Sequence, residues 1–270
     1  MLANGALIAL LGAGHLFVKF ALPQVVLTVE HGQGFAKLED SVRQPCCAAP
    51  SVREPGNASS NGYTFHMIAA RLPCAPGLSP FHLKGLAYRG LVHAVAAMPG
   101  GLDALCDSLD DPALRDFARQ PFLASGWYDL LPIQPITHAL AKLVRQPFSA
   151  VVRSGTIAQA RYDALHVFHR MYDGATVEDL PARVPRFNAQ YLDFGRSEVI
   201  WTEPKRILSR LHETPAYAAE WQSAMMAAYT EESARIGGAT GVEVTSLAPV
   251  ALPSRGGFRI ATIGCELRWV

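Results

Sequence analysis

The stretch that decides the fold is TPAYAAEWQSAMMAAYTEESARIGG, residues 214–238. Its opening Thr214–Pro215 pair is typical of a helix start, and its closing Gly237–Gly238 pair is typical of a helix end. Between these pairs, large side chains recur every four residues and therefore share one helix face: Tyr217, Trp221, Met225 and Tyr229. We expect a long helix here, with this face packed on a sheet.

Segments with the alternating pattern of strands flank this helix on both sides. Before it, AQYLDFGRSEVIWTEP (189–204) reads as two short strands joined at Gly195. After it, TGVEVTSLAPV (240–250) and GGFRIATIGCELRWV (256–270) read as two more strands. The order strand–strand–helix–strand–strand predicts a small antiparallel sheet that is covered on one face.

Helices precede this unit along the chain. Four segments have apolar residues at helical spacing: 81–98, 110–122, 136–144 and 154–174. In the last of them we expect an inner stripe made by Ile157, Ala164, Leu165, Phe168 and Tyr172. The sequence therefore predicts an α+β fold, in which a helical layer is followed by a β-β-α-β-β unit forming a small antiparallel sheet.

The composition changes twice along the chain, which predicts three regions. Residues 1–40 form an apolar N-terminal segment to which we assign no structural class. Residues 41–78 are rich in Pro, Gly and Ser without a sustained period, so we interpret them as a poorly ordered linker. Residues 79–270 carry the regular patterns, and we expect them to form a single α+β domain.

The apolar start of the chain resembles a targeting or membrane segment only in part. A signal peptide would need a basic region before its apolar stretch, and that region is missing here. A membrane span would be interrupted by His15, Lys19 and Pro23. We therefore expect no membrane association unless residues 1–29 insert.

The same segment permits a third interpretation, dinucleotide binding. Gly12 and Gly14 follow a strand-like run, and Glu30 follows a second one. Glycines that open a helix let a pyrophosphate approach its N-terminus, and an acid can bind a ribose hydroxyl. The place of the third glycine is taken by Phe17. An NAD-dependent enzyme built on Gly12 and Gly14 is our second alternative for the function.

Charge and cysteine content exclude several classes of partner. The 270 residues include 24 Lys and Arg and 23 Asp and Glu, a formal net charge of +1, which argues against nucleic acid as a partner. The five cysteines are odd in number and lack the spacing of a zinc site. We interpret them as reduced thiols and expect a cytoplasmic protein.

Five side chains are candidate ligand-binding residues: Arg89, His93, Trp127, Tyr128 and His169. The first two lie four residues apart at the edge of an expected helix, and the Trp-Tyr pair suits an apolar pocket with a polar rim. His169, with His93 or His166, is the candidate ligand for haem or a metal. We assign no catalytic residue and no metal site, because no Walker loop, HExxH, GxSxG, SxxK or EF-hand pattern occurs.

A succession of short segments carries a family resemblance: FHLKGLAYRGLV (81–92), LASGWYDLLP (123–132), ALHVFHRMY (164–172), YLDFGRSEVIW (191–201), the long helix, and ELRWV (266–270). This succession resembles a large uncharacterised paralogous family abundant in myxobacteria. More distantly, it is similar to haem nitric-oxide-binding and vinyl-reductase-type ligand-sensor domains. The resemblance covers residues 79–270 and implies a ligand sensor.

The sequence departs from both kinds of sensor at their cofactor motifs. It has neither the Tyr-x-Ser-x-Arg string of haem sensors nor the cysteine cluster of the vinyl-reductase type, so neither cofactor is carried over. We expect a non-enzymatic regulatory module that binds a small apolar ligand or a protein partner, and we leave catalysis, cofactor and oligomeric state open. A haem- or metal-binding sensor using His169 is the first alternative.

Overall fold

The computed structural model describes residues 11–12, 15–20, 25–28 and 71–270. The chain divides into two compact units, Met1–Arg71 and Leu72–Val270. The described residues of the first unit form three antiparallel strands in the order β1-β2-β3: β1 Leu11–Gly12, β2 His15–Phe20 and β3 Val25–Thr28.

Strand β2 contradicts the prediction of dinucleotide binding. Such a site needs a helix directly after its glycines, whereas residues 15–20 pair as a strand with residues 25–28. Gly12 ends strand β1, and Gly14, Glu30 and most of the predicted linker lie outside the described residues. An NAD-dependent enzyme at Gly12 and Gly14 therefore loses its structural basis.

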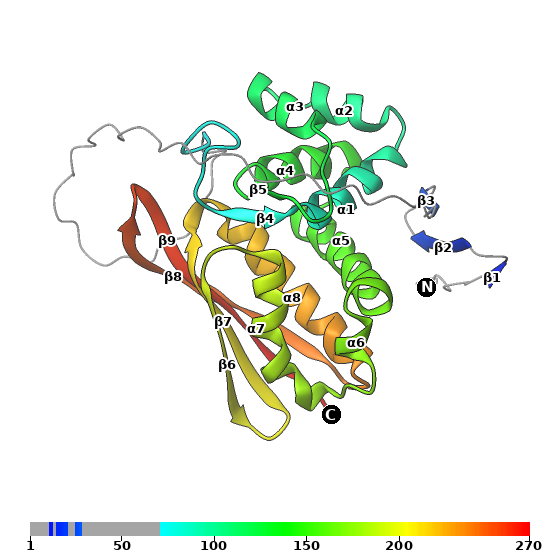
Figure 1. Cartoon of the computed structure of the whole chain (residues 1–270), viewed down its shortest axis with the longest axis vertical. Coiled ribbons are helices and arrows are strands. Elements are labelled where there is room, and N and C mark those ends of the chain that lie inside the picture. Colours follow the sequence, from blue (N-terminus) through cyan, green and yellow to red (C-terminus); the bar gives the residue numbers. More distant parts are fainter. Residues whose placement is uncertain (1–10, 13–14, 21–24, 29–70) are drawn as a thin grey trace. The chain divides into compact units, whose positions relative to one another are not determined.

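The second unit contains helices followed by a four-stranded sheet (Figure 1). Its first elements are β4 His82–Lys84, α1 Gly85–Ala96, α2 Gly101–Asp107, α3 Pro112–Arg119, β5 Trp127–Asp129, α4 Ile133–Val144 and α5 Phe148–Tyr162. A π-helical turn, Asp163–Val167, leads to α6 His169–Tyr172, and a 3-10 turn, Val177–Asp179, leads to α7 Leu180–Tyr191. The last elements are β6 Arg196–Glu203, β7 Arg206–Pro215, a 3-10 turn Ala216–Ala218, α8 Ala219–Ile236, β8 Glu243–Arg255 and β9 Phe258–Arg268. No helix in the described part of the chain is long and apolar enough to cross a membrane.

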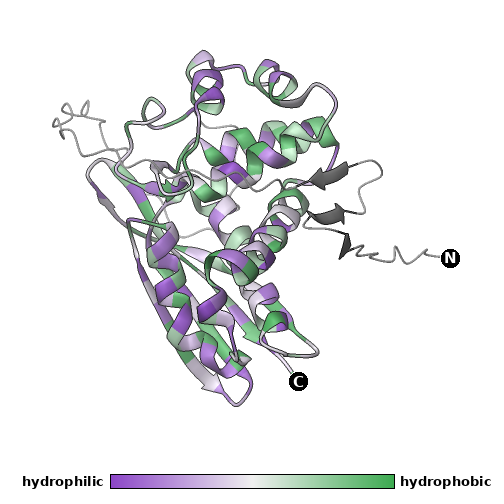
Figure 2. Cartoon of the chain, turned by 45° about the vertical axis from the view of Figure 1, so that its right-hand side comes forward, coloured by the Kyte–Doolittle hydropathy of each residue, from purple (hydrophilic) through white to green (hydrophobic). Residues whose placement is uncertain are grey.

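The four-stranded sheet is antiparallel throughout, in the order β6-β7-β9-β8. Alternate residues of its two central strands are buried: Ile207, Ser209, Leu211, Ile263, Cys265 and Leu267. Hydrophilic and hydrophobic residues both occur along these strands (Figure 2), as expected for a sheet with one packed and one solvated face. The predicted α+β fold with a small antiparallel sheet is confirmed.

Helix α8 packs against the sheet on one side and against α5 on the other. Toward the sheet, the Thr230 hydroxyl lies 3.7 Å from the Cys265 sulfur on β9. Toward the helices, the Tyr229 hydroxyl donates a hydrogen bond to Asp163, at 3.0 Å. The expected sheet-facing stripe is therefore wrong at Tyr229. A helix covered on both sides buries residues around most of its circumference, so periodicity alone does not tell its two faces apart.

The two strands predicted around Gly195 are displaced. Residues 180–191 form helix α7, which contains Pro185, and Gly195 has a positive φ of 77° just before β6. The hairpin turn lies at Pro204 and Lys205 instead. Burial of Phe187 in the core offsets the cost of a proline inside the helix.

The helix predicted for residues 81–98 begins later than expected. Residues 82–84 pair as strand β4 with β5, where Leu83 lies opposite Tyr128, so that helix α1 starts only at Gly85. Tyr88 of this helix is fully buried and donates a 2.6 Å hydrogen bond to the carbonyl oxygen of Asp129. The core thus contains a tyrosine whose hydroxyl is satisfied by a hydrogen bond.

The segment predicted as one long helix, 154–174, is interrupted by the π-helical turn. Its buried residues are Thr156 and Ala160 in α5 and Asp163 at the start of the π turn. The predicted stripe residue Leu165 is 62% exposed. A π turn inserts one extra residue and so rotates the face that follows it. The stripe prediction failed because it assumed an uninterrupted α-helical period.

Candidate functional site

A shallow hollow of about 260 Å³ lies beside helix α1. We call it the α1 groove, and it is lined by Arg89, Val92, His93, Leu102, Ala118, Arg119, Gln120, Pro121 and Phe122. These residues come from α1, α2, α3 and the segment that follows α3. The sequence analysis named two of them, Arg89 and His93, as candidate ligand-binding residues.

The floor of the α1 groove is anchored in the hydrophobic core. The Phe122 ring stacks on the buried Tyr88 ring with centroids 4.5 Å apart and an interplanar angle of 7°. The Tyr128 ring meets Phe122 edge-on at 4.8 Å, and the Tyr128 hydroxyl accepts a hydrogen bond from the Leu123 backbone N–H at 2.8 Å. These contacts hold the segment after α3 in place, so the floor is formed before any ligand binds.

Close packing at Gly85 fixes the same segment from the other side. A Cβ at this position would lie 2.1 Å from the carbonyl oxygen of Leu123 and 2.6 Å from Cε2 of Tyr128. The Gly85 N–H also donates a 2.9 Å hydrogen bond to the carbonyl oxygen of Gly126. Only glycine permits this approach, so Gly85 helps position the groove without lining it.

The charged residues that line the α1 groove are positive. Arg89 and His93 are exposed on α1, and in the described part of the chain Arg89 has no ion-pair partner. Arg119 makes a 3.1 Å ion pair with Asp103, whose side chain is 85% exposed. None of the described residues that line the groove is acidic. The rim therefore offers cationic donors above an apolar floor.

A second group of polar residues lies inside the helical layer. We call it the Asp163 cluster; it contains Gln159, Asp163, Tyr191 and Tyr229. Asp163 is fully buried and accepts hydrogen bonds from the Tyr191 hydroxyl at 2.6 Å, the Gln159 amide at 2.7 Å and the Tyr229 hydroxyl at 3.0 Å. The cluster joins the α5–π-turn segment to α7 and α8, so it ties three elements together.

Burial changes the acid–base behaviour of this cluster. It raises the pKa of Asp163 from 3.8 to about 6, although the hydrogen bonds from Tyr191, Gln159 and Tyr229 act in the opposite direction. Burial and the nearby carboxylate raise the pKa values of Tyr191 and Tyr229 above the usual range for tyrosine. Asp163 thus titrates near neutral pH while the tyrosines remain hydrogen-bond donors.

The Asp163 cluster also touches helix α1. The side-chain oxygen of Gln159 lies so close to Gly90 that a Cβ there would be 3.0 Å from it. Gly90 directly follows the groove residue Arg89 on α1. The groove and the cluster thus both contact the same segment of α1.

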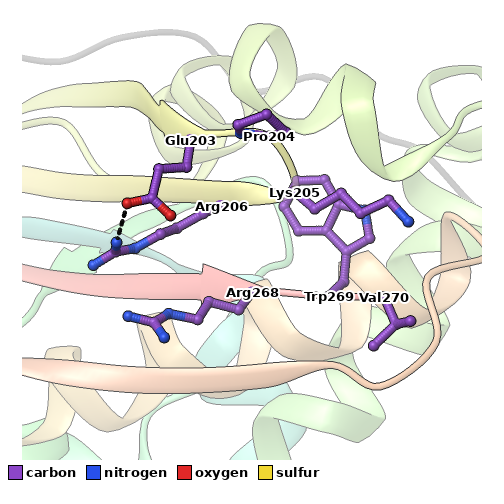
Figure 3. A pocket seen from close by; sticks show the side chains of 7 residues that line it. All are labelled: Glu203, Pro204, Lys205, Arg206, Arg268, Trp269 and Val270. Atoms are coloured by element: carbon purple, nitrogen blue, oxygen red, sulfur yellow. Dashed lines mark hydrogen bonds and ion pairs between the residues drawn. The ribbon is translucent and has the colours of Figure 1, made fainter.

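A larger hollow, of about 370 Å³, lies at the β6–β7 turn and the end of β9. Figure 3 shows its lining, including the ion pair between Arg206 and Glu203. Arg206 and Arg268 are both paired with Glu266, at 2.7 Å each. These pairs already satisfy two of the cations in this hollow, so it is the weaker candidate for a charged ligand.

The remaining candidates from the sequence lie apart from the α1 groove lining. Trp127 is 42% exposed on β5, and the Lys84 ammonium lies 3.8 Å from its ring centroid, a cation–π arrangement. Tyr128 supports the groove from below through Phe122. His169 is exposed on α6, and the described residues contain no cluster of three or more metal-ligating side chains.

Sequence reasoning missed the buried carboxylates. Asp163 was assigned to no role, because it stands between the apolar residues of a predicted helix. Asp129, also buried, accepts hydrogen bonds from the Gly77 N–H at 2.8 Å and the Leu131 N–H at 2.9 Å and so holds the turns around β5. The available signal was an acidic residue at an inward helical position, which is costly unless donors surround it.

The chain matches no protein-family model and no curated protein. Solved structures of H-NOX domains are similar to it. One, from work on heme distortion in the H-NOX family, is 10% identical, covers 69% of this chain and 95% of that chain, and has a TM-score of 0.51. A Cs H-NOX mutant containing 4-cyano-L-phenylalanine is 10% identical, with coverage of 69% and 96% and a TM-score of 0.52. A T. tengcongensis H-NOX mutant is 9% identical, with coverage of 69% and 97% and a TM-score of 0.50.

At these identities the likeness shows the fold alone. This chain has the fold of H-NOX domains, which confirms the distant similarity to haem nitric-oxide-binding domains at the level of structure. The resemblances to a myxobacterial family and to vinyl-reductase-type domains stay predictions.

The fold raises the question of haem, and the described residues do not fit a buried, histidine-ligated haem. Of the six histidines in residues 71–270, His93, His166 and His169 are exposed. The other three are half-buried and engage carboxylates: His82 with Asp193, His138 with Glu220 and His212 with Glu198. Both hollows characterised above are open to solvent, and aromatic side chains pack between α6, α7 and α8, as in the Tyr172–Phe187 stack at 5.2 Å.

Proposed function

We propose that this chain is a non-enzymatic regulatory module of the H-NOX fold that senses a small ligand bound in the α1 groove. The observation that carries this proposal is the groove itself, with an apolar floor fixed on the core and cationic side chains at its rim. Ligand sites in proteins typically combine a largely apolar surface with a few placed polar groups. Arg89 and His93 are the proposed ligand-contacting residues.

The floor gives such a ligand a route to the rest of the fold. The Phe122 ring stacks on the Tyr88 ring, and the Tyr88 hydroxyl donates a hydrogen bond to the carbonyl oxygen of Asp129. Next to Arg89 on α1, Gly90 lies against the Gln159 side chain of the Asp163 cluster. A ligand that shifts α1 therefore acts on elements that also contact α7 and α8, which is the arrangement a regulatory module requires.

The test is native mass spectrometry of the full chain purified without added ligand, next to an Arg89→Gln variant. We expect the parent to retain an extra mass that denaturation releases, and the variant to retain less of it. A retained mass that is equal in both proteins would place the ligand elsewhere. A protein partner in place of a small ligand would contradict the proposal as stated.

A haem sensor using His169 is the second candidate, and the likeness to H-NOX domains is the observation that favours it. The test is a titration with hemin followed by absorbance, using His169→Ala and, as a matched control, His166→Ala. An absorbance change that is lost only in His169→Ala would support this candidate, and an identical spectrum in all three proteins would exclude His169 as the ligand.

A further inference from the structure

Building on the proposed function, we propose that the α1 groove selects a small amphipathic monoanion, an apolar chain ending in one carboxylate that Arg89 binds. The proposal concerns the chemical class of the ligand, which the fold does not indicate. It rests on three features of the groove: its charge, its floor and its size.

The charge of the α1 groove matches a single negative group. Within the described part of the chain its lining has no acidic residue, and its cations are Arg89, Arg119 and, when protonated, His93. The Asp103 carboxylate already engages Arg119. Arg89 is therefore the permanently charged residue of the groove lining that has no ion-pair partner among the described residues. A monoanion would be neutralised here, whereas a cation would be repelled.

The guanidinium of Arg89 is suited to a carboxylate in particular. Its planar fork donates two parallel hydrogen bonds to the two oxygens of one carboxylate. His93 follows four residues later on α1, which places it on the same side of the helix as Arg89. A neutral or protonated His93 can donate one further hydrogen bond to the same group.

The floor of the α1 groove favours an apolar chain next to that carboxylate. Val92, Leu102, Ala118, Pro121 and Phe122 line the hollow between the cations. Because Phe122 is stacked on the buried Tyr88 ring, the floor does not need to be ordered when a ligand binds. An apolar chain laid on this surface is removed from water at little cost in side-chain entropy.

The size of the groove limits the ligand to a short chain. Its volume of about 260 Å³ lies below the usual range for drug-sized ligands, roughly 300–1,000 Å³. A chain of the length of octanoate is therefore a suitable probe, and a macrocycle is not.

The experiment compares octanoate, octanol and octylamine, which share one apolar chain and differ in charge. Calorimetric titration of the full chain should show octanoate as the tightest ligand, octanol as weaker and octylamine as the weakest. Arg89→Gln should weaken octanoate by about tenfold or more, because a charge-assisted bidentate contact is lost, and should leave octanol unchanged. Arg170→Gln, at an exposed arginine on α6, is the matched control and should leave all three affinities unchanged.

The possible outcomes separate this inference from the proposed function. If octanol binds as tightly as octanoate and Arg89→Gln alters neither, the groove binds apolar molecules without selecting an anion, and the inference is wrong while the proposed function survives. If inorganic phosphate alone competes fully with octanoate, the apolar floor does not contribute and the inference is wrong. If none of the three probes binds, both the inference and the α1 groove as a ligand site are contradicted.

Discussion

Arg89 and Asp163 are charged residues of one helical layer in opposite surroundings. Asp163 is fully buried, and its carboxylate accepts hydrogen bonds from three side chains of the protein itself. Arg89 is exposed, has no ion-pair partner within the described part of the chain, and borders an apolar hollow. The two sites are connected by a contact between helices α5 and α1, in which the Gln159 side chain lies against Gly90.

The difference separates a charge that serves the fold from one that is available to a ligand. A buried carboxylate whose donors are all internal contributes to helix packing, and its energetics appear in stability and its pH dependence. An exposed guanidinium without a partner contributes little to stability and is free to bind an anion. Substitutions at the two sites should therefore change different measured quantities.

The largest effect on stability is expected for Asp163→Ala at pH 5, where the carboxyl group is mostly protonated. The change leaves the buried Tyr191 and Tyr229 hydroxyls and the Gln159 amide without their partner, so the free energy of unfolding should fall by about 3–5 kcal/mol. Urea unfolding followed by circular dichroism measures it. Asp173→Ala, at an exposed aspartate, is the control and should change stability by less than about 0.5 kcal/mol.

The pH dependence of stability is the next largest effect. Because folding raises the pKa of Asp163 from 3.8 to about 6, its contribution to stability is fully present below pH 3.8 and is lost as the pH rises through about 6. The difference corresponds to on the order of 3 kcal/mol. Glu231 and Glu266, whose pKa values are lowered by paired arginines, contribute with the opposite sign.

Comparison with Asp163→Asn isolates the contribution of Asp163. Unfolding of both proteins between pH 4 and pH 8 should show the parent losing stability relative to the variant as the pH rises. Parallel curves for the two proteins would mean that Asp163 keeps an ordinary pKa in the fold.

A smaller loss of stability is expected for Gly85→Ala, and this substitution should also change the shape of the α1 groove. The new Cβ would meet the Leu123 carbonyl oxygen and the Tyr128 ring, so the segment carrying Phe122 must shift, at a cost of about 1–3 kcal/mol. Octanoate binding should weaken in parallel. Gly155→Ala, at a helical glycine with open space around it, should cost nothing and leave binding intact.

The smallest effect on stability is expected for Arg89→Gln. An exposed side chain without an ion-pair partner among the described residues should change the free energy of unfolding by less than about 0.5 kcal/mol, while the octanoate affinity falls. Thermal unfolding and calorimetry on the same sample measure both quantities. A large loss of stability would mean that Arg89 serves the fold, and the contrast with Asp163 would disappear.

The sequence predicted the parts of the fold that follow one regular period. The long helix α8 and strands β8 and β9 were found because Gly and Pro mark their ends and their patterns run without interruption. Helix α7 was missed because Pro185 argues against a helix, and the packing of Phe187 that offsets it is a tertiary contact. The inner stripe predicted after residue 162 was misplaced because nothing in the local sequence signals the π turn.

The candidate site was predicted in part. Arg89 and His93 were named because they lie four residues apart at a helix edge, and the structure places both on the α1 groove. Apart from Val92 on α1, the rest of its lining comes from residues 102–122, which only the tertiary fold brings beside α1. Asp163 could not be assigned, because its donors Tyr191 and Tyr229 lie 28 and 66 residues away along the chain.

The most direct test of the account is a map of amide chemical shifts in ¹H–¹⁵N spectra of the full chain during titration with octanoate. We expect the shifts to concentrate at residues 89–93, 102 and 118–122 and to saturate with one affinity. Shifts centred instead on the β6–β7 turn and Trp269, or spread evenly over the chain, would contradict the α1 groove as the ligand site.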